Sequence, residues 1–76
     1  MELNRDTKLK DIVSAYPSLK TRLAEINPKF SLLNSPIGKV MIGKVTISDM
    51  SQKSGMDINS LIDGIRKLME EETLST

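Results

Sequence analysis

The pattern that most constrains the fold of this chain lies between residues 46 and 69. Thr46 and Asp57 carry side chains favoured at helix N-caps, Asp49 places a carboxylate in a first turn, and Gly55 can adopt the left-handed conformation that ends a helix. Apolar residues then recur at the spacing of an amphipathic helix: Ile58, Leu61, Ile62, Ile65, Leu68 and Met69. The segment predicts a short helix, a tight turn and a long helix whose apolar face the rest of the chain must cover.

Prolines divide the remainder of the chain. Pro17 ends a first helix, which Asp6 or Thr7 caps, and it also suits the first position of a second helix. Asn27-Pro28 ends that second helix, and Ser35-Pro36 is a cap-and-proline start for a third. The residues expected on the inner faces of these three helices are Leu9, Ile12, Val13, Tyr16, Leu19, Leu23, Ile26, Ile37, Val40 and Met41.

Two segments and three glycines leave alternatives open. Residues 29–35 form either a short helical turn or an ordered loop, and residues 42–47 carry a β signal that has no partner strand, so helix is favoured there. Gly38 and Gly43 each weaken the third helix by roughly 1 kcal/mol relative to alanine. Gly64 is either a tolerated exposed glycine or a point of close approach by the backbone of another helix.

Taken together, these signals predict an all-α fold. We expect a compact bundle of about five short helices that ends in a helix-turn-helix-like αα-hairpin. Residues 1–76 are expected to form a single helical domain, ordered over about residues 3–70. The glutamates at 70–72 place negative charge at the negative end of the last helix, so we expect the C-terminal tail to be frayed.

The composition leaves little room for chemistry. The chain has no cysteine and no histidine, which excludes disulfides, thiolate metal sites, cysteine nucleophiles and the commonest general base. The carboxylates are interpreted as caps or solvent-facing groups. Residues 38–45 resemble the beginning of a phosphate-binding loop but lack the Ser/Thr after Lys44 and a preceding strand. We therefore expect no enzymatic activity, no metal and no cofactor.

Charge and hydropathy bear on location and partners. The net charge is +1, but residues 28–54 sum to +3 and residues 55–76 to −3. No apolar run approaches the length that spans a bilayer, and no signal-peptide pattern is present at the N-terminus. We expect a cytoplasmic monomer without membrane association, with a protein partner of unknown identity.

A crowded apolar segment suggests where that partner binds. Large apolar residues with lysines interleaved crowd positions 29 to 44, and a core this small has limited capacity to bury all the apolar side chains. The alternative is that most of them are core. The candidate interaction surface consists of Phe30, Leu32, Leu33, Ile37, Lys39 and Met41.

The αα-hairpin offers a different function. Its spacing is that of a helix-turn-helix, so the alternative to an interaction or accessory module is a weak nucleic-acid binder. Asp57 and Asp63 would face the phosphates, which opposes binding. A small-ligand sensor is a more distant third possibility.

Four motifs resemble those of a known family. They read Thr7-Lys-Leu-x-Asp-Ile-Val, Tyr16-Pro-Ser-Leu, Leu23-x-x-Ile26 and Thr46-Ile-x-Asp-Met-x-x-x-Ser-Gly-Met-Asp-Ile-x-x-Leu-Ile. Together they look like a small helical domain of unknown function. Its relatives include the hybrid-cluster-protein-associated redox disulfide domain and the N-terminal domain of iron–sulfur cluster repair proteins. The resemblance covers about residues 3–69 and implies an all-helical bundle.

The resemblance carries over no site residue. In the redox branch a Cys-x-x-Cys-Pro motif follows the second helix, whereas here residues 29–36 read Lys-Phe-Ser-Leu-Leu-Asn-Ser-Pro. Pro36 is the counterpart of the motif's proline, but both cysteines are missing, so thiol–disulfide chemistry has no residue to perform it. The chain looks like a cysteine-free branch with a binding or accessory role.

Overall fold

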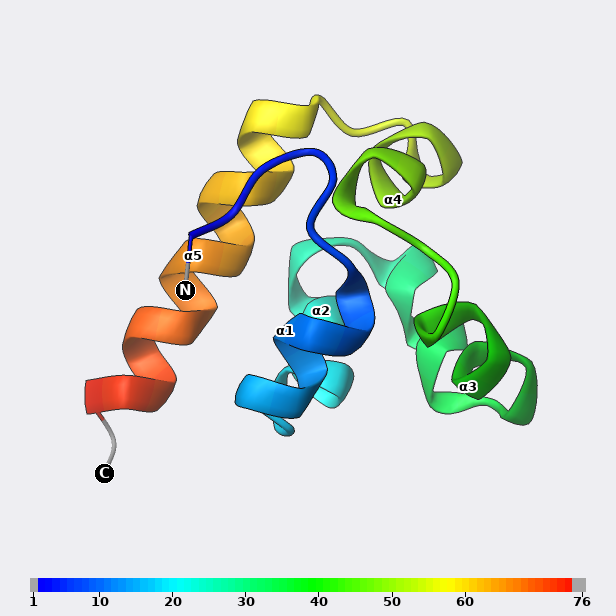
Figure 1. The fold of residues 1–76 in the computed structure, drawn as a ribbon, viewed down its shortest axis with the longest axis horizontal. Coiled ribbons are helices and arrows are strands. Elements are labelled where there is room, and N and C mark those ends of the chain that lie inside the picture. The colour runs from blue at the N-terminus through cyan, green and yellow to red at the C-terminus, as the bar shows by residue number, and fades with distance from the viewer. Residues whose placement is uncertain (1, 75–76) are drawn as a thin grey trace.

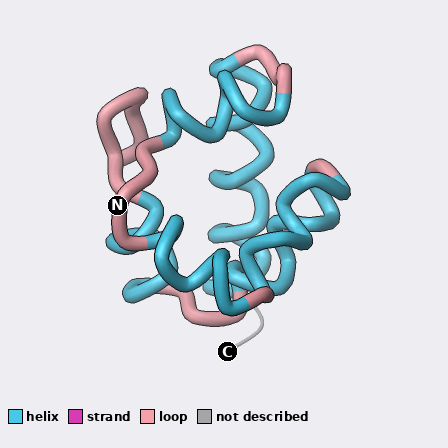
Figure 2. The backbone as a smooth tube through the Cα atoms, turned by 90° about the vertical axis from the view of Figure 1, so that its right-hand side faces the viewer, coloured by secondary structure: helices cyan, strands magenta, loops and turns pink. Residues whose placement is uncertain are grey.

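The computed structural model describes residues 2–74, which form an all-α bundle. Short turns join its helices, and none of residues 2–74 lies in a strand (Figure 2). The predicted architecture of about five short helices is confirmed, and the open segment 29–35 is largely a 3-10 helix. The elements are α1 (Leu9–Ala15), α2 (Leu19–Ile26), η1 (Pro28–Asn34), α3 (Pro36–Ile42), α4 (Ile47–Ser54) and α5 (Ile58–Leu74).

The completely buried centre of the core is built from four of the α-helices. α5 runs along one side of the molecule, and α3 lies at the opposite end of the long axis (Figure 1). Burial of large aliphatic side chains between these elements supplies most of the stabilisation, at roughly 1.5–3 kcal/mol each. The side chains that are completely buried are Leu9 and Ile12 from α1, Leu19 and Leu23 from α2, Ile47 from α4, and Leu61 and Ile65 from α5.

The hairpin of α4 and α5 forms as its local sequence predicts. The Thr46 hydroxyl accepts a hydrogen bond from the Asp49 N–H (3.2 Å), and the Asp49 carboxylate accepts one from the Thr46 N–H (3.0 Å), which makes a capping box. Gly55 ends α4 with a φ of 76°. The Asp57 carboxylate then caps α5 by accepting from the backbone N–H groups of Asn59 and Ser60 (3.1 and 3.2 Å).

The start of α1 differs from the prediction. Lys8 occupies the N-cap position and no side chain caps the helix, so the assignment of Asp6 or Thr7 as the cap is wrong. The first amide finds a tertiary acceptor instead, because the Leu9 N–H donates to the Val45 carbonyl (3.0 Å). Residues 43–46 join α3 to α4 without forming helix, so the expectation of helix there is wrong, and the β signal is reduced to one isolated antiparallel bridge between Lys8 and Thr46.

Pro17 and Pro28 lie at helix boundaries, but the helix after Pro17 begins later than predicted. α2 begins at Leu19, after a turn that contains Pro17, rather than at the proline itself. Pro28 is the first residue of η1. The Asn27 side chain caps this helix by accepting from the Lys29 N–H (2.9 Å).

α3 packs mainly against η1, and its orientation corrects a second prediction. Ser35 caps α3 by accepting from the Gly38 N–H (3.2 Å), as its position before Pro36 predicts. Gly38, however, is buried against the η1 backbone, whereas Ile37 and Val40 are 72% and 59% exposed. The prediction that Ile37 and Val40 point inward is therefore wrong. Close backbone packing through the glycine turns the apolar side chains to the surface.

α5 packs against α2 through a glycine. A Cβ on Gly64 would lie 3.3 Å from Cδ1 of Ile26, so Gly64 faces a neighbour rather than open solvent, but that neighbour is a side chain of α2 and not the helix backbone of the second alternative. α5 continues to Leu74, beyond the expected end of order near residue 70. Residues 75 and 76 of the predicted tail lie outside the described residues.

Candidate interaction site

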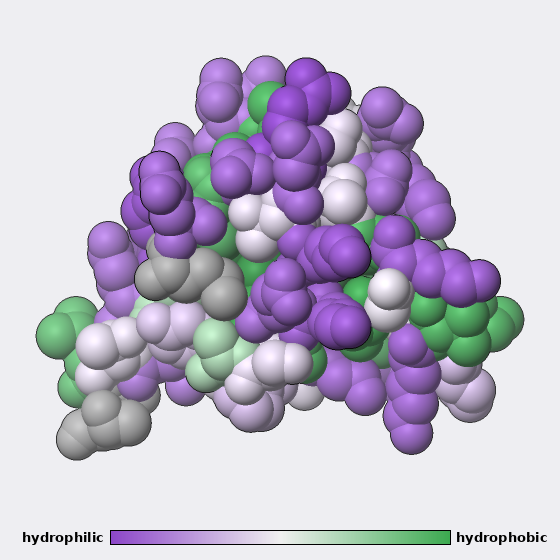
Figure 3. All heavy atoms as spheres, in the orientation of Figure 1, coloured by the Kyte–Doolittle hydropathy of each residue, from purple (hydrophilic) through white to green (hydrophobic). Residues whose placement is uncertain are grey.

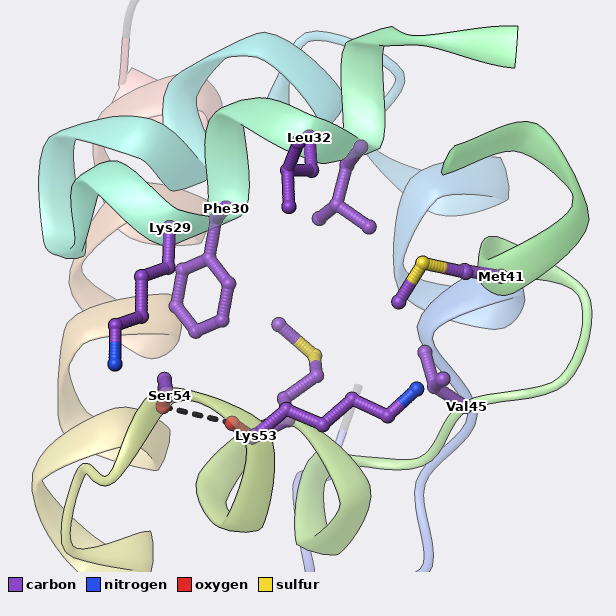
Figure 4. Close-up of a pocket in the computed structure, with 9 residues that line it drawn as sticks. Lys29, Phe30, Leu32, Met41, Val45, Lys53 and Ser54 are labelled. Atoms are coloured by element: carbon purple, nitrogen blue, oxygen red, sulfur yellow. Dashed lines mark hydrogen bonds between the residues drawn. The ribbon is translucent and has the colours of Figure 1, made fainter. Parts of the chain in front are cut away.

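A cavity of about 180 Å³ opens between η1, α3 and α4 (Figure 4). Most of its lining belongs to the edge of the hydrophobic core, and Figure 4 shows the Phe30 ring directed into it. The surface can therefore receive an apolar group in contact with the core. The apolar side chains that line the cavity are Phe30, Leu32, Leu33, Met41, Val45 and Met50.

Two lysines and one serine are the polar members of the lining. Lys29 comes from η1 and Lys53 from α4, and both are exposed. Within the described residues, neither lysine forms an ion pair. The Ser54 hydroxyl is already used, because it donates to the Met50 carbonyl (2.7 Å). The cavity thus combines an apolar interior with two unneutralised ammonium groups at its border.

An exposed apolar patch adjoins the cavity. Its members are Leu32, which is 64% exposed and also lines the cavity, and Ile37 and Val40 on α3. Figure 3 shows hydrophobic surface over α3. We name these three residues the apolar patch, and the patch together with the cavity the binding face. Leu74 is exposed as well, but it lies at the end of α5, on the opposite side of the molecule (Figure 1).

The structure divides the residues of the sequence-predicted interaction surface. Phe30 and Leu33 are buried, so they belong to the core and reach a partner only as cavity wall. Leu32 and Ile37 are at the surface in the apolar patch. The remaining two, Lys39 and the half-buried Met41, lie on α3 with Ile37 and Val40.

Sequence reasoning missed the contribution of α4 to this site. Met50 and Lys53 line the cavity from across the fold, about twenty residues from η1 in sequence. The periodicity of α4 identifies Met50 as inward, and the positive charge of residues 28–54 already includes Lys53. Neither signal shows that the two residues meet η1, because that contact is set by tertiary packing.

The hairpin presents negative charge at the N-terminal end of α5. Asp57 and Asp63 are exposed there. The only ion pair that either makes within the described residues joins Asp63 to Arg66, at 3.6 Å on the surface. The αα-hairpin geometry is thus confirmed, with two carboxylates on the helix that a helix-turn-helix protein would place against phosphates.

The largest cluster of charges joins α2 to the end of α5. The Arg22 guanidinium forms ion pairs of 3.0 Å with Glu25, Glu71 and Glu72. These carboxylates, led by Glu25, raise the pKa of Arg22 above its ordinary value. Hydrogen bonding from Ser18, followed by Arg22, lowers the pKa of Glu72. Arg22 is the one positive charge in this cluster of three carboxylates, and its ion pairs with Glu71 and Glu72 tie α2 to the end of α5.

This cluster predicts a pH-dependent contribution to stability. Because the pKa of Glu72 is lower in the folded state than its ordinary value of 4.5, its contribution is present above 4.5 and is lost as the pH falls through the lower folded value. We expect Glu72→Gln to unfold at lower urea than the wild type at neutral pH, and the difference to shrink well below pH 4.5. A difference that stays constant with pH in urea titrations would contradict this assignment.

The part of the chain that the structure describes holds neither a metal-binding cluster nor a helix that could span a membrane. Residues 2–74 contain no group of three or more aspartates and glutamates placed to hold a metal ion. The described helices also include none that has both the length and the apolar character to cross a membrane.

Comparison with known proteins identifies the family. No curated protein and no solved structure matches the chain significantly. A family described as a domain of unknown function, DUF1858, matches residues 3–62, from the segment before α1 to the first turns of α5. The match confirms the resemblance to a domain of unknown function, while kinship with the redox disulfide and cluster repair domains stays a prediction. This chain belongs to the DUF1858 family.

Proposed function

We propose that this chain is a non-catalytic protein-interaction module that binds a partner protein through the binding face. The observation that carries the proposal is the junction of an apolar cavity of about 180 Å³ with three exposed large hydrophobic residues. Contiguous apolar surface on a small domain is characteristic of a protein–protein contact, whose centre is apolar and whose rim is polar. Here the exposed lysines supply that rim.

The use of the carboxylates supports a role without catalysis. Asp49 and Asp57 cap helices, and Glu71 and Glu72 bind Arg22. With cysteine and histidine absent from the sequence, these groups would be the main source of an acid, a base or a nucleophile. The same distribution supports a protein partner over a nucleic acid, since the exposed N-terminal end of α5 bears negative charge.

Aspartate substitutions on the binding face test the proposal. We expect Leu32→Asp and Ile37→Asp each to reduce partner capture at least about tenfold, because a carboxylate would have to be desolvated in an apolar contact. Both side chains are mostly exposed, so the fold should be retained, as circular dichroism and urea titration can verify. The measurement is quantitative cross-linking of the purified chain in lysate, read by mass spectrometry.

The matched control is Leu74→Asp. It makes the same change in charge and polarity at a side chain that is 85% exposed and lies away from the binding face. Capture should be unchanged in this variant. If Leu32→Asp and Ile37→Asp capture the same proteins as the wild type and Leu74→Asp, the partner binds elsewhere and the proposal is wrong.

A further inference from the structure

We propose that the occupant of the binding face is an acidic amphipathic helix of another protein, with one large apolar side chain in the cavity and carboxylates against Lys29 and Lys53. This inference rests on the proposed function and deepens it by assigning the chemistry of the partner. Three features of the described residues support it: the size of the cavity, the charge around it and the arrangement of the apolar patch.

The volume of the cavity fits a single side chain. At about 180 Å³ it is slightly larger than the cavity of about 150 Å³ that accommodates benzene in an engineered protein core. One phenyl ring or one branched aliphatic group fills it. A long lipid chain exceeds this volume, so the cavity is suited to one anchor residue of a folded segment.

The charges at and near the cavity favour an acidic partner. Residues 28–54 carry Lys29, Lys39, Lys44 and Lys53. Their one carboxylate, Asp49, is engaged in the capping box of α4. Lys29 and Lys53 border the cavity without ion pairs within the described residues, and Figure 4 shows their side chains on different sides of it. A bound segment with carboxylates on either side of its anchor neutralises both ammonium groups.

The patch extends the cavity in the way that a helical ligand needs. Ile37 and Val40 are three residues apart and share the exposed side of α3. Leu32 lines the cavity from η1, the element against whose backbone Gly38 of α3 packs. An amphipathic helix contacts an elongated apolar surface of this kind with its side chains at positions i, i+3 or i+4, and i+7. A ligand that binds as an additional β-strand is disfavoured, because residues 2–74 contain no sheet edge with which it could pair.

A selection experiment on the full chain tests the inference. A displayed library of helix-forming peptides of about 16 residues is panned on the immobilised protein, and enriched peptides are titrated into ¹⁵N-labelled chain. We expect enriched peptides to carry one central Phe, Leu or Trp with Asp or Glu three or four residues away on both sides. Their amide shifts should centre on η1, α3 and α4, and their binding should weaken as salt is raised.

Charge reversal gives the quantitative part of the test. The double substitution Lys29→Glu with Lys53→Glu is expected to weaken acidic-peptide binding about tenfold or more at low salt. The matched control, Lys10→Glu with Lys67→Glu, makes the same change in net charge at exposed lysines of α1 and α5. It should leave the affinity within about twofold of wild type.

The other outcomes separate this inference from the proposed function. Neutral or basic peptides that bind and are lost in Leu32→Asp would overturn the acidic partner and leave the interaction module in place. No enrichment, or peptides indifferent to Leu32→Asp, would overturn both. Amide shifts at the cavity with decanoate alone would also overturn both, in favour of a small amphiphile. Sedimentation could also show that the chain associates with itself. If both Leu32→Asp and Leu74→Asp abolish that self-association, the occupant of the binding face is a second copy of the chain.

Discussion

Phe30→Ala is expected to lower the free energy of unfolding by about 3–5 kcal/mol, the usual cost of removing a buried phenylalanine side chain. Phe30 is only 6% exposed and packs in the core cluster, where it also forms a wall of the cavity. A domain of 76 residues has a total stability of roughly 4–11 kcal/mol. The variant should therefore be largely unfolded, or should unfold at very low urea. Urea titration followed by circular dichroism measures this.

Leu32→Ala is the matched control for this prediction. Leu32 lies two residues away on the same 3-10 helix but is 64% exposed, so its truncation should change the free energy of unfolding by less than about 0.5 kcal/mol. Equal urea midpoints for the two variants would contradict the assignment of Phe30 to the core. The contrast also shows why Phe30 is unsuited to mapping the partner's contact, since a loss of binding there would report unfolding.

Gly38→Ala is expected to destabilise the protein by about 1–3 kcal/mol, although alanine is the better helix former. A Cβ at this position would overlap with the carbonyl oxygen of Leu32 and with the Cα and carbonyl carbon of Leu33. Those atoms are backbone, so relief requires η1 and α3 to move apart rather than a side chain to rotate. The loss should be measured as a lower urea midpoint.

Gly43→Ala, at the end of α3, is expected to have the opposite effect on stability. Its φ and ψ of −73° and −13° are helical, and the nearest atom to a new Cβ is the Val40 carbonyl oxygen at 3.6 Å, an ordinary contact. Alanine should therefore stabilise the fold by about 0.4–1 kcal/mol through the unfolded chain. A stabilising Gly38→Ala, or equal effects at the two glycines, would show that the close backbone contact is not formed.

The αα-hairpin could be predicted from sequence because its signals are local. The capping box of Thr46 and Asp49, the left-handed Gly55 and the cap at Asp57 each act within a few residues, and the structure contains all of them. α3 shows the opposite case. The apolar residues of α3 suggest that Ile37 and Val40 point inward. The inner face is instead the one that carries Gly38, because that glycine packs against the η1 backbone. Hydrophobic periodicity does not reveal such a backbone contact.

The candidate site was predictable in part for the same reason. The density of apolar residues and lysines at 29–42 marks the correct segment, and Leu32 and Ile37 are at its surface. The division between core and surface could not be read from sequence, because it depends on how η1 meets α4. Met50 and Lys53 entered the site only through that packing.

The packing of α3 mainly against η1 has a consequence for dynamics. α3 is short, lacks a completely buried side chain and makes its principal contact with one element, so it can open locally while α1, α2, α4 and α5 keep their packing. Its amide protons would then exchange with solvent through a low-energy opening rather than through global unfolding. A partner that closes over α3 would slow that exchange, and part of its affinity would be spent on holding this helix in place.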